Sequence, residues 1–328
     1  MAAPYKKHSG SKISFSLQIE EGEIEKAQKD VIAHHKKEVS LKGFRKGEAP
    51  DDMVLGAIGP QRAFQEAFDR VITKKYGAFV QEHDLHPVAM PQVDIKDLKK
   101  PPFEVKVEVE VFPEVTVGKY EKFKPKPVKV EVDDKKIDEA LKQLLQMRQL
   151  EVEVKDLTDK QAEEILGQKA TVAELRDQVK VMLEMEGRRA EEGQALNKFK
   201  EKLAGVVKAD LPASWIEREA HQRMEQIKQS PAFKQDQEAF WKHVKKSEEA
   251  LMKDFRKDSE KTLKAYLGLS EIVKTENIEL DKDETKMVLD RLNHQLEHMG
   301  HKGGASDAQK FQALESAKID KFLGSLLS

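Results

Sequence analysis

The sequence lacks four features that would each point to a particular class of protein. The chain of 328 residues contains no cysteine, which excludes a disulfide framework and all thiolate chemistry. It has no run of about 18 apolar residues, the length that a membrane-spanning helix needs. The formal net charge is only −2, which excludes an overall attraction to nucleic acid. Residues 1–7 lack the apolar core of a secretory signal. We therefore expect a soluble, cytoplasmic protein with no membrane partner.

Charged residues are abundant instead. They make up 36% of the chain, against about a quarter in typical globular proteins, while apolar residues make up 38%. Such a composition favours elongated helices with large solvated faces over one compact sphere. The length predicts two or three domains.

The first 112 residues show the patterns of an α+β domain. Apolar and polar residues alternate from Ile13 to Ile19 and again from Phe103 to Val111, which predicts two half-buried strands. Between them the apolar period lengthens to that of amphipathic helices. We expect helices at 21–39, 52–58 and 61–82, the second capped by Asp51 or Asp52, and strands at 12–20, 88–95 and 103–111. Helices on a small antiparallel sheet are the expected fold of residues 1–112.

The remaining residues predict an extended linker followed by helices. Residues 113–132 contain three prolines and are neither glycine- nor serine-rich, which indicates an ordered connection. Beyond it, apolar residues recur at helical spacing, and Thr171 with Glu174 forms a capping box. We expect an elongated all-α domain with arms at 133–328. Its helices are expected to begin near 133, 171, 211, 236, 282 and 307, and the helix from 236 is expected to continue to 267.

One stretch fits neither a helix nor a strand: Gly43-Phe44-Arg45-Lys46-Gly47-Glu48-Ala49-Pro50. Its glycines free the backbone for turns, and its proline has no backbone donor. Residues 36–46 hold five cations and one acid, a net charge of +4. The loop is either a solvated connection whose phenylalanine folds back into the core, or a device that presents an apolar ring and cations to a partner.

This stretch resembles the ribosome-docking signature of the trigger factor family, bacterial chaperones that meet nascent chains. The family pattern is G-F-R-x-G-x-x-P, and its fixed positions are occupied by Gly43, Phe44, Arg45, Gly47 and Pro50, with Lys46 between them. The resemblance implies that these six residues bind the large ribosomal subunit near the tunnel exit, through protein and rRNA. It further implies an ATP-independent chaperone for nascent and unfolded polypeptides, and it leaves a homodimer off the ribosome open.

The resemblance extends along nearly the full chain with looser matches, among them Phe112-Pro113-Glu114-Val115. In the common family architecture a prolyl isomerase domain follows the first arm helix, but here only residues 151–170 separate that helix from the next. So short a segment cannot close a core of its own. We therefore expect a short form that lacks the isomerase domain and is not an enzyme.

Two alternatives stay open. An isomerase-active protein would need a degenerate catalytic unit in the helical half, which is poor in strands and aromatic residues. A helical chaperone or scaffold with no ribosome role would share the helical domain, although the intact loop and the missing signal peptide speak against it.

No pattern of catalytic residues emerges. His294 and His298 lie four apart on an expected helix, a spacing that can hold a metal, but no third ligand is evident beyond Glu297 or His301. We expect a surface histidine pair, with no metal, no cofactor and no catalytic residue.

Methionines indicate where polypeptide clients bind. Met182, Met185, Met224 and Met252 fall on expected helices of the helical half, and Trp215 joins them. Methionine adapts to irregular partners, as promiscuous binding requires. We take these five residues as candidate client contacts; the alternative is that they pack in ordinary cores between helices.

Overall fold

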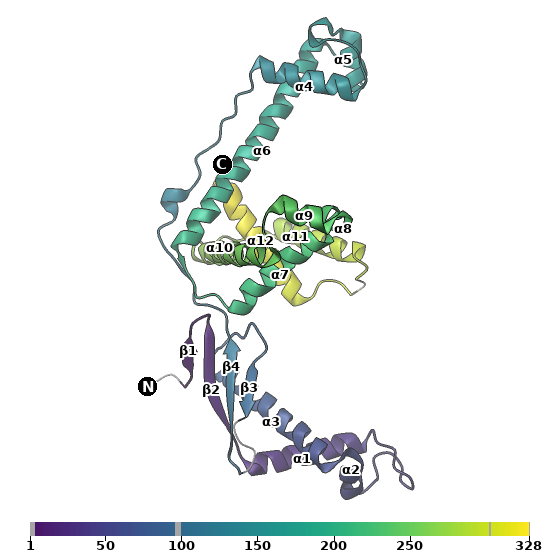
Figure 1. Cartoon of the computed structure of the whole chain (residues 1–328), viewed down its shortest axis with the longest axis vertical. Coiled ribbons are helices and arrows are strands. Elements are labelled where there is room, and N and C mark those ends of the chain that lie inside the picture. Colours follow the sequence, from purple (N-terminus) through teal and green to yellow (C-terminus); the bar gives the residue numbers. More distant parts are fainter. Residues whose placement is uncertain (1–3, 96–99, 302, 328) are drawn as a thin grey trace. The chain divides into compact units, whose positions relative to one another are not determined.

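The computed structural model describes residues 4–95, 100–301 and 303–327. The chain folds into two compact units, each built from two separate stretches of sequence. Unit 1 contains residues 1–115 and 209–260, and unit 2 contains residues 116–208 and 261–328. Figure 1 labels the elements of both. Residues 1–3, part of the stretch 1–7 that was discussed above as lacking the apolar core of a secretory signal, lie outside the described residues.

Unit 1 contains an antiparallel sheet with the strand order β1-β2-β4-β3. The strands are β1 Lys6–His8, β2 Lys12–Ile19, β3 Gln92–Ile95 and β4 Phe103–Glu110. The apolar residues of β2 lie opposite those of β4, as Phe15 does opposite Val107, and both sets are buried. The alternation in the sequence is therefore confirmed as the inner face of this sheet.

The two edge strands differ from the expectation. Strand β1 was not predicted, because three residues are too few to show an alternation. Strand β3 begins at Gln92 rather than near Val88. It is preceded by Pro91, which has no backbone N–H to donate, and by Met90, whose side chain is 93% exposed.

Three helices connect β2 to β3 in the sequence. They are α1 Glu21–Lys36, α2 Asp51–Ile58 and α3 Pro60–Glu82. The apolar stripe of α3, which includes Phe68 and Val71, packs into the same core as the sheet. The expected cap of α2 is wrong, because Pro50 is its N-cap residue. Asp51 and Asp52 lie in the first turn instead, where their negative charges interact favourably with the helix dipole.

The second stretch of unit 1 is helical. It contains α7 Ala213–Gln229, α8 Pro231–Gln235, α9 Gln237–Val244 and the first part of α10 Glu248–Thr275. The expected continuous helix from 236 to 267 is wrong, because it breaks at Lys245, where the backbone is left-handed with φ of 55°. Beside this break, the rings of Phe233, Phe240 and Trp241 pack edge to face with centroids 5.3–5.8 Å apart.

The two stretches of unit 1 meet at the end of the sheet. The Ser11 N–H donates to Asp210 Oδ2 at 3.1 Å. The ring of Phe112 packs edge-on against Trp215, with centroids 5.5 Å apart. These contacts hold the start of α7 against the sheet.

Unit 2 contains a short antiparallel pair and a second set of helices. Strand β5 Thr116–Val117 pairs with β6 Val207–Lys208. The helical elements are η1 Glu121–Phe123, α4 Asp134–Met147, η2 Val154–Asp156, α5 Asp159–Leu166, α6 Val172–Val206, the second part of α10, α11 Lys282–His298 and α12 Asp307–Ser325. The capping box of Thr171 and Glu174 at the start of α6 is confirmed.

Residues 151–170 form a small structured cap. Helix α5 packs with α4 and the start of α6 around one apolar cluster, in which Leu141, Ala162 and Leu175 are buried. The segment thus packs against a core that it shares with α4 and α6, because so short a segment cannot form a core of its own. The expected fold class, a small α+β region followed by a long helical region, is confirmed.

Candidate functional site

The stretch from Gly43 to Pro50 forms most of the loop between α1 and α2, which Figure 1 shows projecting past both helices. Gly43 and Gly47 have φ of 96° and 89°, which residues with a side chain rarely adopt. The N–H of Gly47 donates to the carbonyl of Lys36 at 3.0 Å. The two glycines therefore let the chain turn sharply and return to the end of α1.

Apolar contacts anchor the loop at both ends. Ala49 is buried in a cluster with Ile32 of α1 and Val54 of α2. Leu41, which precedes the loop tip, packs against the same cluster. Because both ends are held, the tip from Lys42 to Glu48 has a defined place on the domain.

Polar contacts tie α1 to its neighbours. Lys36 Nζ lies 2.9 Å from Asp51 Oδ1, which links the end of α1 to the start of α2. His35 Nε2 lies 2.8 Å from Glu66 Oε2 on α3. The hydrogen bond with His35, together with the guanidinium of Arg70, holds the pKa of Glu66 below its usual value. Glu66 therefore stays an anionic partner for α1 at neutral pH.

The loop tip faces solvent. Every residue from Lys42 to Glu48 is exposed, and Phe44 keeps 40% of its surface open, so its ring does not fold back into the core. Within the part of the chain that the structure describes, Lys42, Arg45 and Lys46 form no ion pair. The tip thus presents a ring and three cations with no internal partner.

This arrangement suits an anionic partner surface with an apolar depression. Cations on an exposed loop bind phosphates or carboxylates rapidly and reversibly, with a strong dependence on salt. A ring that enters an apolar crevice adds affinity that salt does not screen. The geometry therefore supports docking to such a surface.

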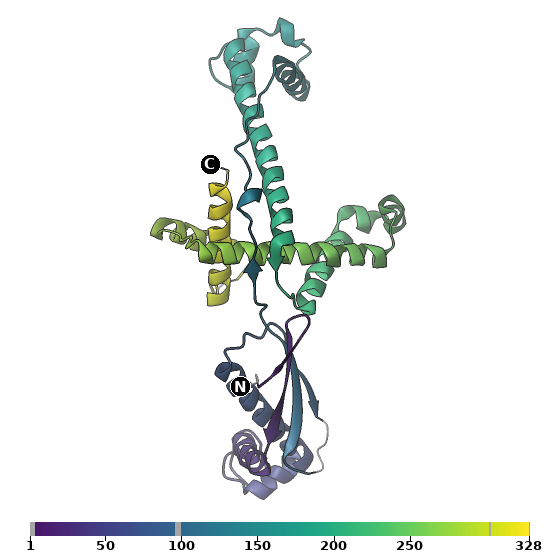
Figure 2. The same ribbon diagram turned by 90° about the vertical axis from the view of Figure 1, so that its left-hand side faces the viewer.

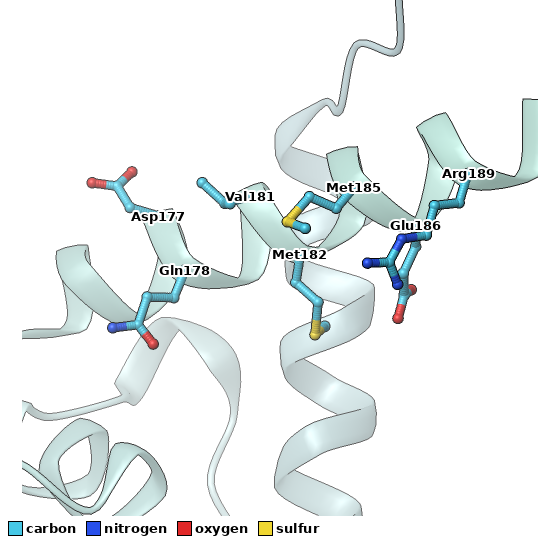
Figure 3. Close-up of a pocket in the computed structure, with 7 residues that line it drawn as sticks. All are labelled: Asp177, Gln178, Val181, Met182, Met185, Glu186 and Arg189. Atoms are coloured by element: carbon cyan, nitrogen blue, oxygen red, sulfur yellow. The ribbon is translucent and has the colours of Figure 1, made fainter. Parts of the chain in front are cut away.

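A second candidate surface lies on α6. It is a shallow hollow of about 510 Å³ whose lining includes Val181, Met182 and Met185. Figure 3 shows these side chains on neighbouring turns of the helix. Met182 and Met185 are 49% and 51% exposed. Charged residues of both signs lie at the ends of the hollow, among them Asp177 and Arg189. An apolar centre with a charged rim can hold an unfolded polypeptide segment without a fixed sequence.

The other three candidate client contacts belong to unit 1 and are not among the residues that line this hollow. Met224 of α7 is only 3% exposed, so in this structure it is a core residue packed between helices. Trp215 is half-buried against Phe112, and Met252 is half-buried on α10. The structure therefore brings together two of the five residues.

Four further apolar side chains of unit 2 are more exposed than Met182 and Met185. Met147 of α4 is 82% exposed. Met287, Met299 and Phe311, on or beside α11 and α12, are 62–69% exposed. No signal in a single sequence separates an apolar residue at the edge of a core from one inside it.

The histidine pair on α11 lies where it was expected. The rings of His294 and His298 pack edge to face, with centroids 4.5 Å apart. Across residues 4–95, 100–301 and 303–327, no three histidine, aspartate or glutamate side chains gather as metal ligands would. In the same ranges, no helix has both the length and the apolar character needed to cross a membrane.

The fold and the loop together define a class of protein: a small α+β domain with an exposed basic loop, continued by long helices in a second unit. Residues 1–144 match the sequence pattern of the bacterial trigger factor protein, and residues 171–315 match that of its C-terminus. The chain belongs to the trigger factor family.

Relatives match about half of the chain. It is 30% identical over 164 residues to the trigger factor of Natranaerobius thermophilus, covering 50% of this chain and 36% of that protein. It is 34% identical over 155 residues to that of Moorella thermoacetica, covering 47% and 34%. The chain thus matches little more than a third of the length of these curated relatives.

A solved structure shows the same fold over the whole chain. It is a trigger factor chaperone described for promiscuous substrate recognition in folding and assembly. It matches 99% of this chain and 99% of its own, with a TM-score of 0.59 and 14% sequence identity.

Proposed function

We propose that the chain is a ribosome-associated, ATP-independent chaperone that binds nascent polypeptides near the tunnel exit and delays their misfolding. The observation that carries this proposal is the loop tip, where an exposed ring and three cations without a partner stand on anchored ends. Phe44, Arg45 and Lys46 make the contacts to ribosomal protein and rRNA, and Gly43, Gly47 and Pro50 set the shape of the loop. Such a role implies a cytoplasmic location.

The proposal assigns a role to each part of the chain. Residues 1–112 form the ribosome-binding domain, residues 113–132 the linker, and residues 133–328 the client-binding part. Docking through one small loop is weak, and so is the capture of an apolar segment by a shallow hollow. When both contacts engage one ribosome and its nascent chain, the second becomes intramolecular and the combined affinity rises by about 10²–10⁴.

Alanine at Phe44, Arg45 and Lys46 together is expected to reduce co-sedimentation with vacant ribosomes to background at low salt. Each charged hydrogen bond that is lost contributes about 1.5–3 kcal/mol, and the ring contact is lost as well. The wild type is expected to pellet at low salt and to dissociate as salt rises. The pelleted fraction, measured across a salt series, checks both expectations.

A matched control replaces Phe311, Arg291 and Lys286 with alanine, which removes one ring and two cations from unit 2. This variant is expected to pellet like the wild type. A wild-type chain that stays in the supernatant at every salt concentration would refute ribosome docking. The helical chaperone or scaffold without a ribosome role would then be the better description.

Serine at Val181, Met182 and Met185 is expected to weaken suppression of aggregation of a chemically denatured client about tenfold. These side chains line the hollow on α6, and removing their apolar surface removes the driving force for client binding. Light scattering during dilution of the client measures the effect. The control places serine at Lys180, Arg188 and Glu191, exposed positions of the same helix; equal loss in both variants would contradict a client role for the hollow.

A separate refolding assay, on a protein whose folding is limited by proline isomerisation, tests for isomerase activity. We propose that the chain has none, because η2 and α5 occupy residues 151–170, where the common family architecture carries the isomerase domain. Refolding limited by proline isomerisation takes tens of seconds without a catalyst. That slow phase is expected to keep its rate, and an acceleration in proportion to the amount of chain added would establish the isomerase-active alternative.

A further inference from the structure

The most basic extended segment of the chain lies in unit 2, away from the loop tip in sequence. Residues 119–129 contain five lysines and one glutamate, a net charge of +4 that equals that of residues 36–46. The proposed docking loop accounts for the charge of residues 36–46. The proposed function does not use the charge of residues 119–129. The segment contains the single turn η1 Glu121–Phe123, and two prolines, at 125 and 127, keep the part after it extended.

Contacts at both ends hold the segment along α6. Before it, β5 pairs with β6, and a Cβ at Gly118 would lie 3.0 Å from the carbonyl oxygen of Val206. After it, Val130 packs so closely on Gly187 of α6 that a Cβ there would lie 2.8 Å from Val130 Cγ1. Figure 2 shows the extended chain following α6 between these points. The lysines therefore lie on an ordered segment rather than on a mobile linker. We call residues 119–129 the lysine track.

One of the five lysines has an internal role. Lys124 Nζ lies 4.0 Å from the Glu276 carboxylate and above the rings of Tyr120 and Phe322. The Tyr120 hydroxyl donates to the same carboxylate, and burial followed by this contact raises the pKa of Tyr120. Glu276 therefore offsets the charge of Lys124, and the charge of the segment comes from the other four lysines.

The other four lysines are exposed and have no acidic partner. Within the described residues, Lys119, Lys122, Lys126 and Lys129 form no ion pair, and neither does Lys202 of α6. The Nζ atoms of Lys122 and Lys202 lie 5.1 and 5.9 Å from the centre of the Phe123 ring. A cation over a ring face gains about 0.5–1 kcal/mol at an exposed site, so this ring helps to position two of the ammonium groups.

We propose that residues 119–129, together with Lys202, bind the phosphate backbone of single-stranded nucleic acid. A row of cations on an extended track matches a linear polyanion whose charges recur at short, regular intervals. The track is ordered before binding, so little conformational entropy is lost when a strand lies along it. Binding of this kind reads charge and not base sequence, because no groove-reading element accompanies the lysines.

A membrane surface fits these observations less well. Among the described residues from 113 to 146, no large apolar side chain is exposed that could enter a bilayer. Phe123 and Tyr120 are both half-buried and already engaged. An acidic polypeptide carries a suitable charge, but its carboxylates end flexible side chains and offer a less regular array than a phosphate backbone.

The test measures binding of the full chain to a short, fluorescently labelled oligouridylate by anisotropy across a salt series. Glutamine at Lys119, Lys126 and Lys129 is expected to weaken binding at low salt about tenfold. The slope of log Kobs against log salt is expected to fall by about 2, since each phosphate contact on a single strand contributes about 0.7. These three side chains form no hydrogen bond or ion pair within the described residues, so the variant is expected to keep its melting temperature.

The matched control places glutamine at Lys234, Lys242 and Lys245, which are exposed in unit 1 and have no ion pair within the described residues. It changes the net charge equally and is expected to bind like the wild type. Equal weakening in both variants, or no change in slope in the track variant, would overturn the proposal.

Two competitors identify the partner. Unlabelled oligouridylate is expected to displace the probe, whereas polyglutamate and vesicles rich in phosphatidylserine are expected to displace it far less at equal charge. Displacement by polyglutamate at the same charge would make the track an acidic-polypeptide site instead. Because the probe is naked nucleic acid and the loop tip is unchanged, failure here and failure of ribosome docking are separate results.

Discussion

Valine at both Gly43 and Gly47 is expected to remove most ribosome binding, although the ring and all the cations of the loop remain. At φ of 96° and 89°, a β-branched side chain collides with its own backbone. The cost in a left-handed conformation is about 1–2 kcal/mol for each residue, or about 2–4 kcal/mol for the pair. The docking conformation then becomes rarer by about thirtyfold or more, and the apparent affinity falls by the same factor.

The fold is expected to survive this change. A Cβ at Gly43 or Gly47 would meet no atom within 4 Å, so the strain is confined to the backbone of the tip. The control places valine at Gly22 and Gly77, which lie in α1 and α3, have no positive φ and are equally open. Co-sedimentation with vacant ribosomes and thermal unfolding, measured for both variants, separate the two effects. Full binding by the Gly43 and Gly47 variant would mean that docking requires the ring and the cations but not the shape of the loop.

The predictable parts of the fold are those whose pattern follows from local geometry. The alternation around Phe15 and Val107 could only be a strand with one buried face, and the structure places both residues inside. The loop tip was predictable for a related reason, because two glycines and a proline exclude regular structure. What the sequence could not show was the anchor, in which Ala49 packs with Ile32 of α1 and Val54 of α2.

One missed element had a signal of its own. Helix α5 begins at a capping box formed by Thr158 and Gln161, and it ends at Gly167, which has the left-handed conformation typical of helix ends. Both signals stand in the sequence of residues 151–170. The break near Lys245 also had a signal, because Ser247 caps α10 by accepting from the Ala250 N–H at 3.2 Å, and Glu248 and Glu249 follow in the first turn.

The candidate client residues mark the limit of a single sequence. Met182 and Met224 have the same side chain on helices of similar pattern, yet one is half-exposed and the other buried. The difference lies in what packs against each helix. On α6, the extended segment covers the face that carries Gly187 and leaves the face of Met182 and Met185 open. Spacing along a helix predicts which residues share a face, but it does not predict which face is covered.

Alanine at Gly268 is expected to destabilise unit 2 by about 1–3 kcal/mol, even though alanine favours a helix by about 1 kcal/mol over glycine. A Cβ at Gly268 would collide with Val207 Cγ2 and would lie 3.4 Å from Leu203 Cγ. Val207 cannot move away easily, because a β-branched side chain has few rotamers and its backbone pairs with β5. Overpacking therefore outweighs the gain in helix propensity.

The same substitution at Gly193 is expected to have the opposite sign. Gly193 lies inside α6, and a Cβ there would meet nothing within 4 Å, so only the propensity gain of about 0.5–1 kcal/mol remains. Thermal unfolding of the two variants, followed by circular dichroism, compares identical chemical changes in two environments. A rise in stability for both variants would mean that the contact between Gly268 and Val207 is looser than the structure has it.

A second substitution tests the cause directly. If the clash with Val207 destabilises the Gly268→Ala variant, alanine at Val207 removes the colliding methyl groups, and the two changes together cost less than the sum of each alone. Residues in such close contact show coupling energies of about 0.5–3 kcal/mol, whereas distant residues are additive within about 0.5 kcal/mol. Additive costs would place the damage elsewhere in α10. A clear coupling would establish that close approach at Gly268 joins α10 to the strand pair from which the lysine track begins.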